Sequence, residues 1–148
     1  MAGVSINKGL QERKIRCLLC VHVLEGHDRG LKYIAKKLTE SGMEVVYIAF
    51  EDVQEIVLAA VQEAVDVVGV SSSTASHVAL FSDLSSALRE KSADDVLLIA
   101  GGIIPTKDIS TLQQMGVGRV FGPGTHGDDV VTFITQNVKK RMNYNLQE

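Results

Sequence analysis

The sequence predicts an α/β fold, a doubly wound five-stranded parallel sheet with helices on both faces. Five short apolar runs rich in β-branched residues alternate with longer segments whose apolar residues recur every three or four positions. Unbroken apolar runs are typical of strands that are buried on both faces. The longer period is typical of amphipathic helices. Strand–helix units repeated in this way indicate a parallel sheet that is covered on both sides.

The elements can be placed along the chain from these two patterns. The predicted strands are Ile15–Val23, Val45–Ala49, Asp66–Val70, Val96–Ala100 and Arg119–Phe121. A helical stripe follows each strand: Leu31, Ile34, Ala35 and Leu38; Val53, Ile56, Val57, Ala60 and Ala64; Leu80, Leu84, Ala87 and Leu88; Ile109, Leu112 and Met115; and Val130, Ile134 and Val138. The first helix is expected to end at Ser41–Gly42, because glycine is the usual residue after a helix C-terminus.

The length of 148 residues suits one domain with this number of units. The natural arrangement is the flavodoxin-like (Rossmann-like) strand order 2-1-3-4-5 with right-handed crossovers. In such sheets the ligand lies beyond the carboxyl ends of the strands, at the switch point between the first and third strands.

Composition excludes several classes of protein. The formal net charge is −3 and no block of Lys or Arg marks a nucleic-acid-binding surface. No apolar run approaches the roughly 20 residues that a membrane span needs. The first residues lack the apolar centre of a signal peptide, so we expect a cytoplasmic protein. We divide the chain into an N-terminal tail (1–14), a ligand-binding domain (15–140) and a C-terminal tail (141–148).

Cys17 and Cys20 have the C-x-x-C spacing of some redox and zinc sites. They fall within a predicted strand, where residues three apart point to opposite faces. A redox pair normally opens a helix, and a zinc site needs two further ligands. We therefore expect two buried, inert thiols.

The loops that follow the strands are LEGHDRG, FEDVQ, SSSTASH, GGIIPT and GPGTHGD. LEGHDRG and SSSTASH are richest in polar chemistry, and both belong to the predicted switch point. Gly26 and Gly30 flank the histidine, and glycine doublets such as Gly101–Gly102 open the next loops. Single glycines commonly make tight turns, but doublets in neighbouring loops also suit a slot for a flat or elongated ligand.

His27 has two interpretations. A solvated loop histidine is the commoner case. A metal ligand is the other, because Glu25 lies two residues before it and ligating histidines usually donate their second ring N–H to a carboxylate or carbonyl. One histidine cannot build a zinc site, but it can be the single axial ligand of a metal held by a macrocycle.

The stretches EGHDRG, GVSSS, AGGIIP and FGPGT, in this order and spacing, resemble the cobalamin-binding domain of methylmalonyl-CoA mutase and related acyl-CoA mutases. The resemblance runs from about Ile15 to about Val138. It implies that His27 replaces the dimethylbenzimidazole base as the lower axial ligand of cobalt. It also implies that the displaced nucleotide tail enters a slot between the first helix and the sheet, which Gly30 opens, and that Ser71 hydrogen-bonds the buried base.

The resemblance implies a set of cofactor-binding residues in the loops after the first, third, fourth and fifth strands. These are Glu25, Gly26, His27, Asp28, Arg29, Gly30, Ser71, Ser73, Gly101, Gly102, Gly122, Pro123, Gly124 and Thr125.

The sequence departs from the family pattern D-x-H-x-x-G and S-x-L at three positions. The usual aspartate before the histidine is Glu25, and the usual leucine after Ser71 is Ser73. The family often has a lysine four residues before that aspartate, and the matching residue is Val21.

By resemblance, the chain is the small, adenosylcobalamin-binding subunit of an isomerase that rearranges the carbon skeleton of an acyl-CoA. The family binds its substrate in a (β/α)₈ barrel of about 250 residues, so a large barrel subunit is the expected partner. The alternative is a non-catalytic cobalamin carrier or sensor.

Three other classes are less consistent with the residues. A phosphosignalling receiver needs an aspartate at the end of its third strand, where this chain has serines. A flavodoxin-type flavin binder is possible on fold alone, but it usually stacks its flavin on loop aromatics, and this chain has no Trp while Tyr33 and Tyr47 lie within predicted elements. A serine hydrolase needs G-x-S-x-G, which GVSSS does not match.

Overall fold

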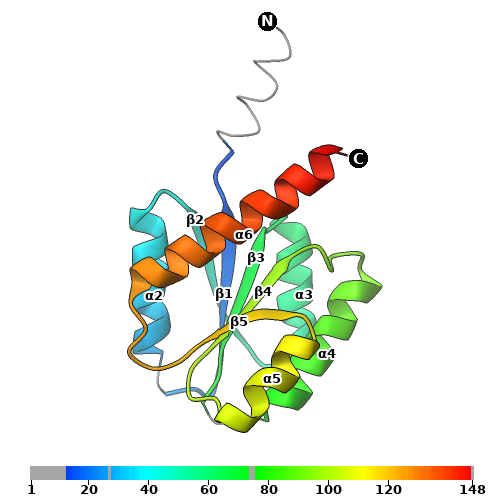
Figure 1. The fold of residues 1–148 in the computed structure, drawn as a ribbon. Helices are drawn as coiled ribbons and strands as arrows, with labels where there is room; N and C mark the ends of the chain where they lie inside the picture. Colours follow the sequence, from blue (N-terminus) through cyan, green and yellow to red (C-terminus); the bar gives the residue numbers. More distant parts are fainter. Residues whose placement is uncertain (1–12, 27, 74–75, 148) are drawn as a thin grey trace, which may run out of the picture.

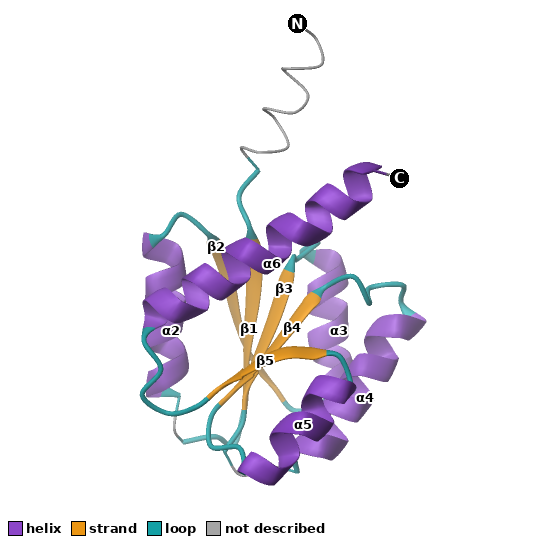
Figure 2. Ribbon diagram, in the orientation of Figure 1, coloured by secondary structure: helices purple, strands orange, loops and turns teal. Residues whose placement is uncertain are grey.

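The five-stranded parallel sheet is present in the strand order β2-β1-β3-β4-β5, as predicted. The computed structural model describes residues 13–26, 28–73 and 76–147, with the backbone alone for 139–147. Figure 1 and Figure 2 show α2 and α6 on one face of the sheet and α3, α4 and α5 on the other. Both ends of the described chain lie at the same end of the sheet, opposite the loops that carry the predicted site.

All ten predicted elements are confirmed, with small shifts at their ends. The strands are β1 (Arg16–His22), β2 (Glu44–Phe50), β3 (Val67–Ser71), β4 (Leu97–Gly101) and β5 (Val117–Phe121). The helices are α2 (Arg29–Glu40), α3 (Val53–Gln62), α4 (His77–Glu90), α5 (Thr106–Gln114) and α6 (Gly127–Gln147). Helix α6 continues into the segment assigned to a C-terminal tail, and the division of the chain into tails and domain stays a prediction.

The assignment of Ala64 to the helical stripe of α3 is wrong. The helix ends at Gln62, and Ala64 is exposed with a φ of 49°. The N–H of Val65 donates to the carbonyl of Ala60, and the N–H of Ala64 to the carbonyl of Val61. These bonds form a Schellman motif, in which the residue after the C-cap adopts the left-handed conformation.

Residues of each strand alternate between two separate cores. Leu18, Val68 and Leu98 pack under α3, α4 and α5. Cys17, Val67 and Leu97 pack under α2 and α6. Cys20 lies in the first core and Cys17 in the second, and both thiols are free and buried. The expectation of two thiols on opposite faces is therefore confirmed.

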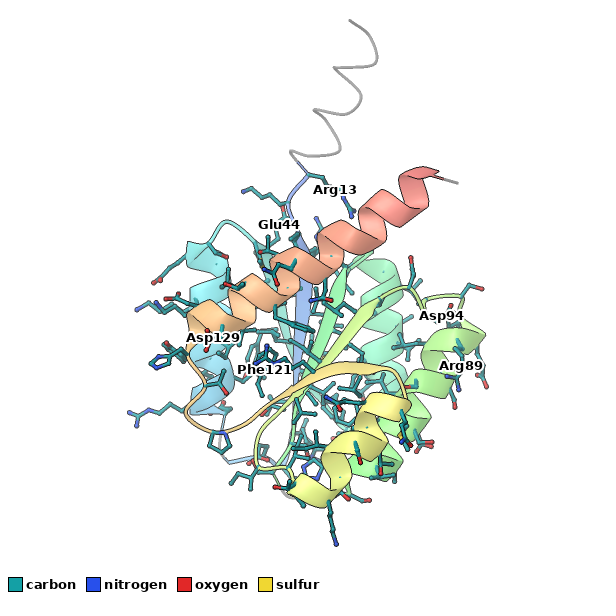
Figure 3. The ribbon with its side chains drawn as sticks, viewed as in Figure 1. Arg13, Glu44, Arg89, Asp94, Phe121 and Asp129 are labelled. Carbon is teal, nitrogen blue, oxygen red and sulfur yellow. The ribbon has the colours of Figure 1, made fainter. Side chains whose placement is uncertain are left out.

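The amino-terminal end of the sheet is held by ion pairs, near the labelled Arg13 and Glu44 in Figure 3. The Asp66 carboxylate accepts from the Arg13 guanidinium at 2.6 Å and from the Arg16 backbone N–H at 2.9 Å. The Arg16 guanidinium donates to Glu44 at 2.8 Å. These contacts join β1 to β2 and to the start of β3, away from the carboxyl-end loops.

Strand β5 is an edge strand whose central residue, Arg119, is exposed. Its guanidinium carbon lies 5.0 Å from the ring centre of Phe121 and 5.6 Å from that of Phe133. Both distances are within the range of cation–π attraction. The arginine therefore covers part of the aromatic surface at this end of the second core.

None of the helices in the described part of the chain has both the length and the apolar character that crossing a membrane requires.

The loops after β3 and β4 touch through backbone atoms. The Ser72 N–H donates to the Gly101 carbonyl at 3.1 Å. Gly102 has a φ of 105°, and a Cβ at this position would overlap the Ser72 carbonyl oxygen. A side chain is excluded here by both the backbone conformation and the neighbouring loop.

Gly102→Ala is expected to destabilise the protein more than Gly116→Ala. Gly116 has a similar φ of 103°, but a Cβ there would meet no atom within 4 Å. Gly116→Ala should therefore cost the strain of the left-handed conformation, about 1–2 kcal/mol. Gly102→Ala should cost at least about 1 kcal/mol more, since it also separates the two loops. Urea unfolding of both variants measures the difference, and equal losses would mean that the loops separate freely.

The two cysteines should make stability fall at alkaline pH. Burial raises the pKa of the Cys17 thiol from 9.0 to about 12, and burial also raises the pKa of the Cys20 thiol. The folded state therefore keeps these protons while the unfolded state releases them. The free energy of unfolding should drop above about pH 9, by up to about 1.4 kcal/mol per pH unit for each thiol. Urea unfolding from about pH 8 to pH 10 measures this slope. The double variant Cys17→Ala/Cys20→Ala should show a shallower slope, and an unchanged slope would contradict the assignment.

Candidate functional site

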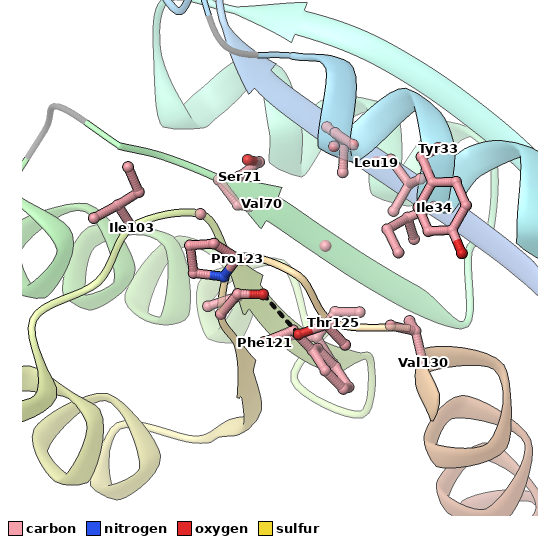
Figure 4. A pocket seen from close by; sticks show the side chains of 18 of the residues that line it. Leu19, Tyr33, Ile34, Val70, Ser71, Ile103, Phe121, Pro123, Thr125 and Val130 are labelled. Atoms are coloured by element: carbon pink, nitrogen blue, oxygen red, sulfur yellow. Dashed lines mark hydrogen bonds between the residues drawn. The ribbon is translucent and has the colours of Figure 1, made fainter. Parts of the chain in front are cut away.

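A cavity of about 560 Å³ opens at the carboxyl end of the sheet, on the face covered by α2 and α6. Its lining comes from β1, β3, β4 and β5, from α2 and α6, and from the loops after β3, β4 and β5. Figure 4 shows Ser71, Pro123 and Thr125 around its mouth and Leu19, Ile34 and Val130 further along it. The cavity thus extends from the predicted switch point into the space between the sheet and its helices.

The floor of the cavity consists of small residues on adjacent strands. Gly69 lies opposite Leu19 of β1 and Ile99 of β4. Two residues further along the strands, toward their carboxyl ends, Ser71 of β3 pairs with Gly101 of β4. A Cβ at Gly69 would lie 3.0 Å from the Leu19 side chain and 3.2 Å from that of Ile99. Leu19 and Ile99 therefore lean toward Gly69 and leave no room for a side chain there, and all three residues line the cavity.

Helices α2 and α6 form the other wall. Gly30, Tyr33 and Ile34 contribute from α2, and Val130 contributes from α6. The N–H of Gly127 donates to the Tyr33 hydroxyl oxygen at 3.4 Å. A Cβ at Gly127 would overlap the side chain of Lys37, so the absence of a side chain lets the start of α6 approach α2. This approach places the first turn of α6 beside the cavity.

Tyr47 lies on β2, opposite Leu19. It belongs to the same cross-strand row of residues as Leu19, Gly69 and Ile99. Its hydroxyl oxygen is buried and has no hydrogen-bond partner among the described residues. Burial raises the pKa of the Tyr47 hydroxyl, and the negative charge of Asp28 raises it further, while Lys32 opposes the change. The neutral phenol is therefore favoured beneath the start of α2.

The loop after β5 presents backbone rather than large side chains to the cavity. Gly122, Pro123 and Gly124 are exposed at its mouth. The Thr125 hydroxyl donates to the Gly122 carbonyl at 2.6 Å, and Gly124 has a φ of 79°. This tight turn keeps the loop close to the sheet edge, beside Phe121, which Figure 3 labels between β5 and α6.

Glu25 connects the first loop to the third. Its carboxylate accepts a hydrogen bond from the Ser73 backbone N–H at 3.0 Å. The Glu25 N–H donates to the His22 carbonyl at 2.9 Å, which closes the turn after β1. Loops that are 48 residues apart in the sequence are thus joined at the switch point. His27, the predicted metal ligand, lies outside the described residues.

The remaining residues of the first loop lie beside the cavity rather than in its lining. Asp28 precedes α2 and forms an ion pair with Lys32 at 3.1 Å. Gly26 and Arg29 are exposed. Nine of the fourteen predicted site residues line the cavity: Gly30, Ser71, Ser73, Gly101, Gly102, Gly122, Pro123, Gly124 and Thr125.

Twelve cavity residues were not predicted as site residues from the sequence. They are Leu19, Leu31, Tyr33, Ile34, Gly69, Val70, Ile99, Ala100, Ile103, Phe121, His126 and Val130. A glycine inside a strand often marks a close backbone approach, so Gly69 within VVGVS was the available signal. Ile34 and Val130 belong to helical stripes that predict core packing equally well, and their periodicity does not distinguish a core from a cavity wall.

The chemistry of the lining suits an organic ligand. Hydroxyls of Ser71, Ser73 and Thr125 lie near apolar side chains, an arrangement typical of small-molecule and cofactor sites. Within the described ranges, no group of three or more His, Cys, Asp or Glu side chains could hold a metal ion.

Comparison with known proteins shows the family. The family model of the B12 binding domain matches residues 15–131. The chain is 35% identical to the 2-hydroxyisobutanoyl-CoA mutase small subunit of Aquincola tertiaricarbonis, over 89% of this chain and 98% of that subunit. It is 43% identical to methylmalonyl-CoA mutase of Cereibacter sphaeroides over 77% of this chain, and that stretch is 16% of the mutase.

Solved structures show the same fold. A cobalamin-binding protein from Desulfitobacterium hafniense matches 90% of this chain and 64% of its own, with a TM-score of 0.71 and 19% identity. A signal receiver domain from Vibrio parahaemolyticus matches 92% of this chain and 98% of its own, with a TM-score of 0.71 and 12% identity. Together with the sequence matches, these findings show that the chain belongs to the B12-binding domain family, among methylmalonyl-CoA mutase and the small subunits of related acyl-CoA mutases.

Proposed function

We propose that this chain is the cofactor-binding small subunit of an adenosylcobalamin-dependent acyl-CoA mutase. In this proposal it binds the cofactor in the base-off form, with His27 as the lower axial ligand of cobalt. The observation that carries the proposal is the cavity at the switch point, whose floor contains Gly69, Ser71 and Gly101.

The cavity fits the displaced nucleotide tail of cobalamin. Its volume of about 560 Å³ lies within the roughly 300–1,000 Å³ that is usual for small-molecule sites. Apolar side chains such as Leu19 and Ile99 offer surface for a flat base. Ser71 is buried at the end of β3 and offers a hydroxyl to a polar atom of that base.

The glycine-rich loops serve the part of the cofactor outside the slot. Gly101 and Gly102 lie together at the end of β4, where the absence of side chains lets a macrocycle approach the backbone. Gly122 to Thr125 do the same after β5. Their exposed backbone N–H and carbonyl groups can bind the polar substituents of a corrin ring.

His27 would hold the cobalt, and Glu25 would orient the imidazole ring of His27. Glu25 is close enough in sequence to accept from the ring, and its carboxylate is tied to the loop after β3 by the Ser73 N–H. Orienting partners of this kind fix the tautomer and direction of a ligating histidine. Bound adenosylcobalamin would supply radical chemistry through homolysis of its cobalt–carbon bond, while the protein binds, orients and shields it.

The partner and substrate class follow from the relatives. The small subunits of 2-hydroxyisobutanoyl-CoA mutase and pivalyl-CoA mutase are 35% and 37% identical to this chain. Their names support a separate large subunit. In this proposal that subunit is a barrel that binds the acyl-CoA and covers the cofactor on the side away from His27. The carboxyl edge of the sheet is the surface that such a subunit would cover.

The spectrum of bound cofactor tests the role of His27. Wild-type protein mixed with adenosylcobalamin should give the visible spectrum of the base-off, histidine-ligated form. His27→Ala should lose this form and bind at least about tenfold more weakly, because a metal ligand is removed. His126→Ala, a histidine at the cavity rim, is the matched control and should keep the histidine-ligated spectrum. If His27→Ala keeps the spectrum and the affinity of the wild type, the assignment is contradicted.

Co-purification distinguishes a mutase subunit from a cobalamin carrier. A cobalamin-loaded, tagged chain should retain a barrel-sized partner from its native extract, and the complex should isomerise an acyl-CoA. A chain that binds cobalamin but enters no such complex would favour the carrier.

Gly69→Val tests the cavity as the binding slot. The added side chain should push Leu19 and Ile99 into the cavity, because a Cβ alone already lies 3.0–3.2 Å from them. We expect a stability loss of about 1–3 kcal/mol from overpacking. We also expect at least about tenfold weaker cobalamin binding, or about 1.4 kcal/mol.

Ala87→Val is the matched control for this variant, since Ala87 is buried in the core on the opposite face of the sheet. It should lose similar stability and keep its affinity for cobalamin. If Gly69→Val binds like the wild type, the tail does not occupy this cavity.

A further inference from the structure

One peptide group, between Ser72 and Ser73, is hydrogen-bonded on both sides by side chains. Its carbonyl oxygen lies 2.9 Å from Nε2 of His77, and its N–H donates to the Glu25 carboxylate at 3.0 Å. Because a carbonyl can only accept, Nε2 of His77 carries the proton of this bond. The chain of contacts is His77 to peptide to Glu25, across three segments of the sequence.

His77 is placed for this contact by the fold. It is the first residue of α4 and is 6% exposed, and Ser72 is 2% exposed. The N–H of Ser72 is held separately by the Gly101 carbonyl. Removing the imidazole would take a donor from a buried carbonyl, and such groups are costly to leave unsatisfied. His77 thus determines the orientation of the 72–73 peptide plane.

The orientation of that plane determines where the Ser73 N–H points, and hence where the Glu25 carboxylate is held. A donor on the carbonyl also polarises the peptide and strengthens the bond that its N–H makes. Val21, which matches the family's lysine, is a buried apolar residue and cannot donate to Glu25. In this chain a backbone N–H on the third loop supplies a hydrogen bond to that carboxylate.

We infer that His77 is a positioning residue of the cofactor site, acting on Glu25 through the peptide group that joins Ser72 to Ser73. The inference rests on the proposed function where it concerns cobalamin. The contact between His77, the peptide and Glu25 can be tested without the cofactor.

The first experiment is NMR of the cofactor-free protein. The Ser73 amide proton should resonate downfield, as expected for a hydrogen bond to a carboxylate. It should move upfield in Glu25→Ala and also in His77→Leu, which lacks a donor. His77→Gln offers an amide donor to the Ser72 carbonyl and should keep the wild-type shift. An unmoved Ser73 signal in His77→Leu would overturn the inference, as would equal changes in His77→Leu and His77→Gln.

The matched control is Ser85→Ala. Ser85 is also buried on α4, and its hydroxyl donates to a backbone carbonyl, that of Met115, at 3.2 Å. This variant removes a similar bond without touching the third loop, so the Ser73 signal should stay in place. If His77→Leu does not fold, His77→Ala replaces it, since it also removes the donor.

The second experiment measures adenosylcobalamin affinity in the same variants. His77→Leu should bind about tenfold more weakly, the lower end of the effect of removing an outer partner of a metal ligand. His77→Gln and Ser85→Ala should bind like the wild type. In the Glu25→Ala background, His77→Leu should add less than about threefold, because the two residues act in series. If the losses of affinity in Glu25→Ala and His77→Leu multiply in the double variant, the two residues act independently and the inference is overturned.

The two proposals fail in different ways. If wild type and His27→Ala give the same cobalamin spectrum, the proposed function is contradicted, while the Ser73 signal still reports the His77–Glu25 contact. If the spectrum depends on His27 but the Ser73 signal is unchanged in His77→Leu, the inference alone is contradicted.

Discussion

Hydrogen bonding of β1 to β2 on one side and to β3 on the other determines where a ligand can lie. Because the chain leaves β1 toward one edge and β3 toward the other, the loops after these strands diverge above the middle of the sheet. The space between them is bridged by the bond from the Ser73 N–H to Glu25. The small residues Gly69 and Ser71 lie directly below, so the opening between the loops continues into the molecule. The ion pairs of Asp66 and Glu44 hold the opposite end of the sheet, away from this opening.

The two faces of the sheet differ, because one carries a continuous core and the other carries both a core and the cavity. The face under α3, α4 and α5 carries a large continuous core that includes Phe50, Phe81 and Leu112. The face under α2 and α6 is packed at its amino-terminal end, around Cys17 and Val67, and hollow at its carboxyl end. A cavity forgoes dispersion contacts that a filled core would make. This loss falls on one end of one face, and a ligand bound there would restore the missing contacts.

The strands, their order and the place where the cavity opens could be predicted because they depend on local patterns and general topology. Apolar runs and helical stripes identify all ten elements, and the switch-point rule then selects the loops of Glu25 and Ser71. Contacts between residues distant in the sequence could not be predicted. The glycine of VVGVS indicates a close approach, but which side chains approach Gly69 depends on strand pairing, and the His77–Ser72 contact depends on the path of a loop. The end of α3 was misplaced because Ala64 fits the helical period but adopts the left-handed conformation that usually selects glycine. The role of His27 rests on the family resemblance and stays a prediction.

Arg119 has a consequence for the behaviour of the protein in concentrated solution. An edge strand offers unpaired N–H and carbonyl groups to any other extended chain, and natural sheets discourage such pairing with charged side chains. On β5 the charge of Arg119 is held over Phe121 and Phe133, and the residue is exposed. The side chain that covers the aromatic rings therefore also places a charge on the edge strand. A charge at such an edge disfavours pairing with the strands of other copies of the chain.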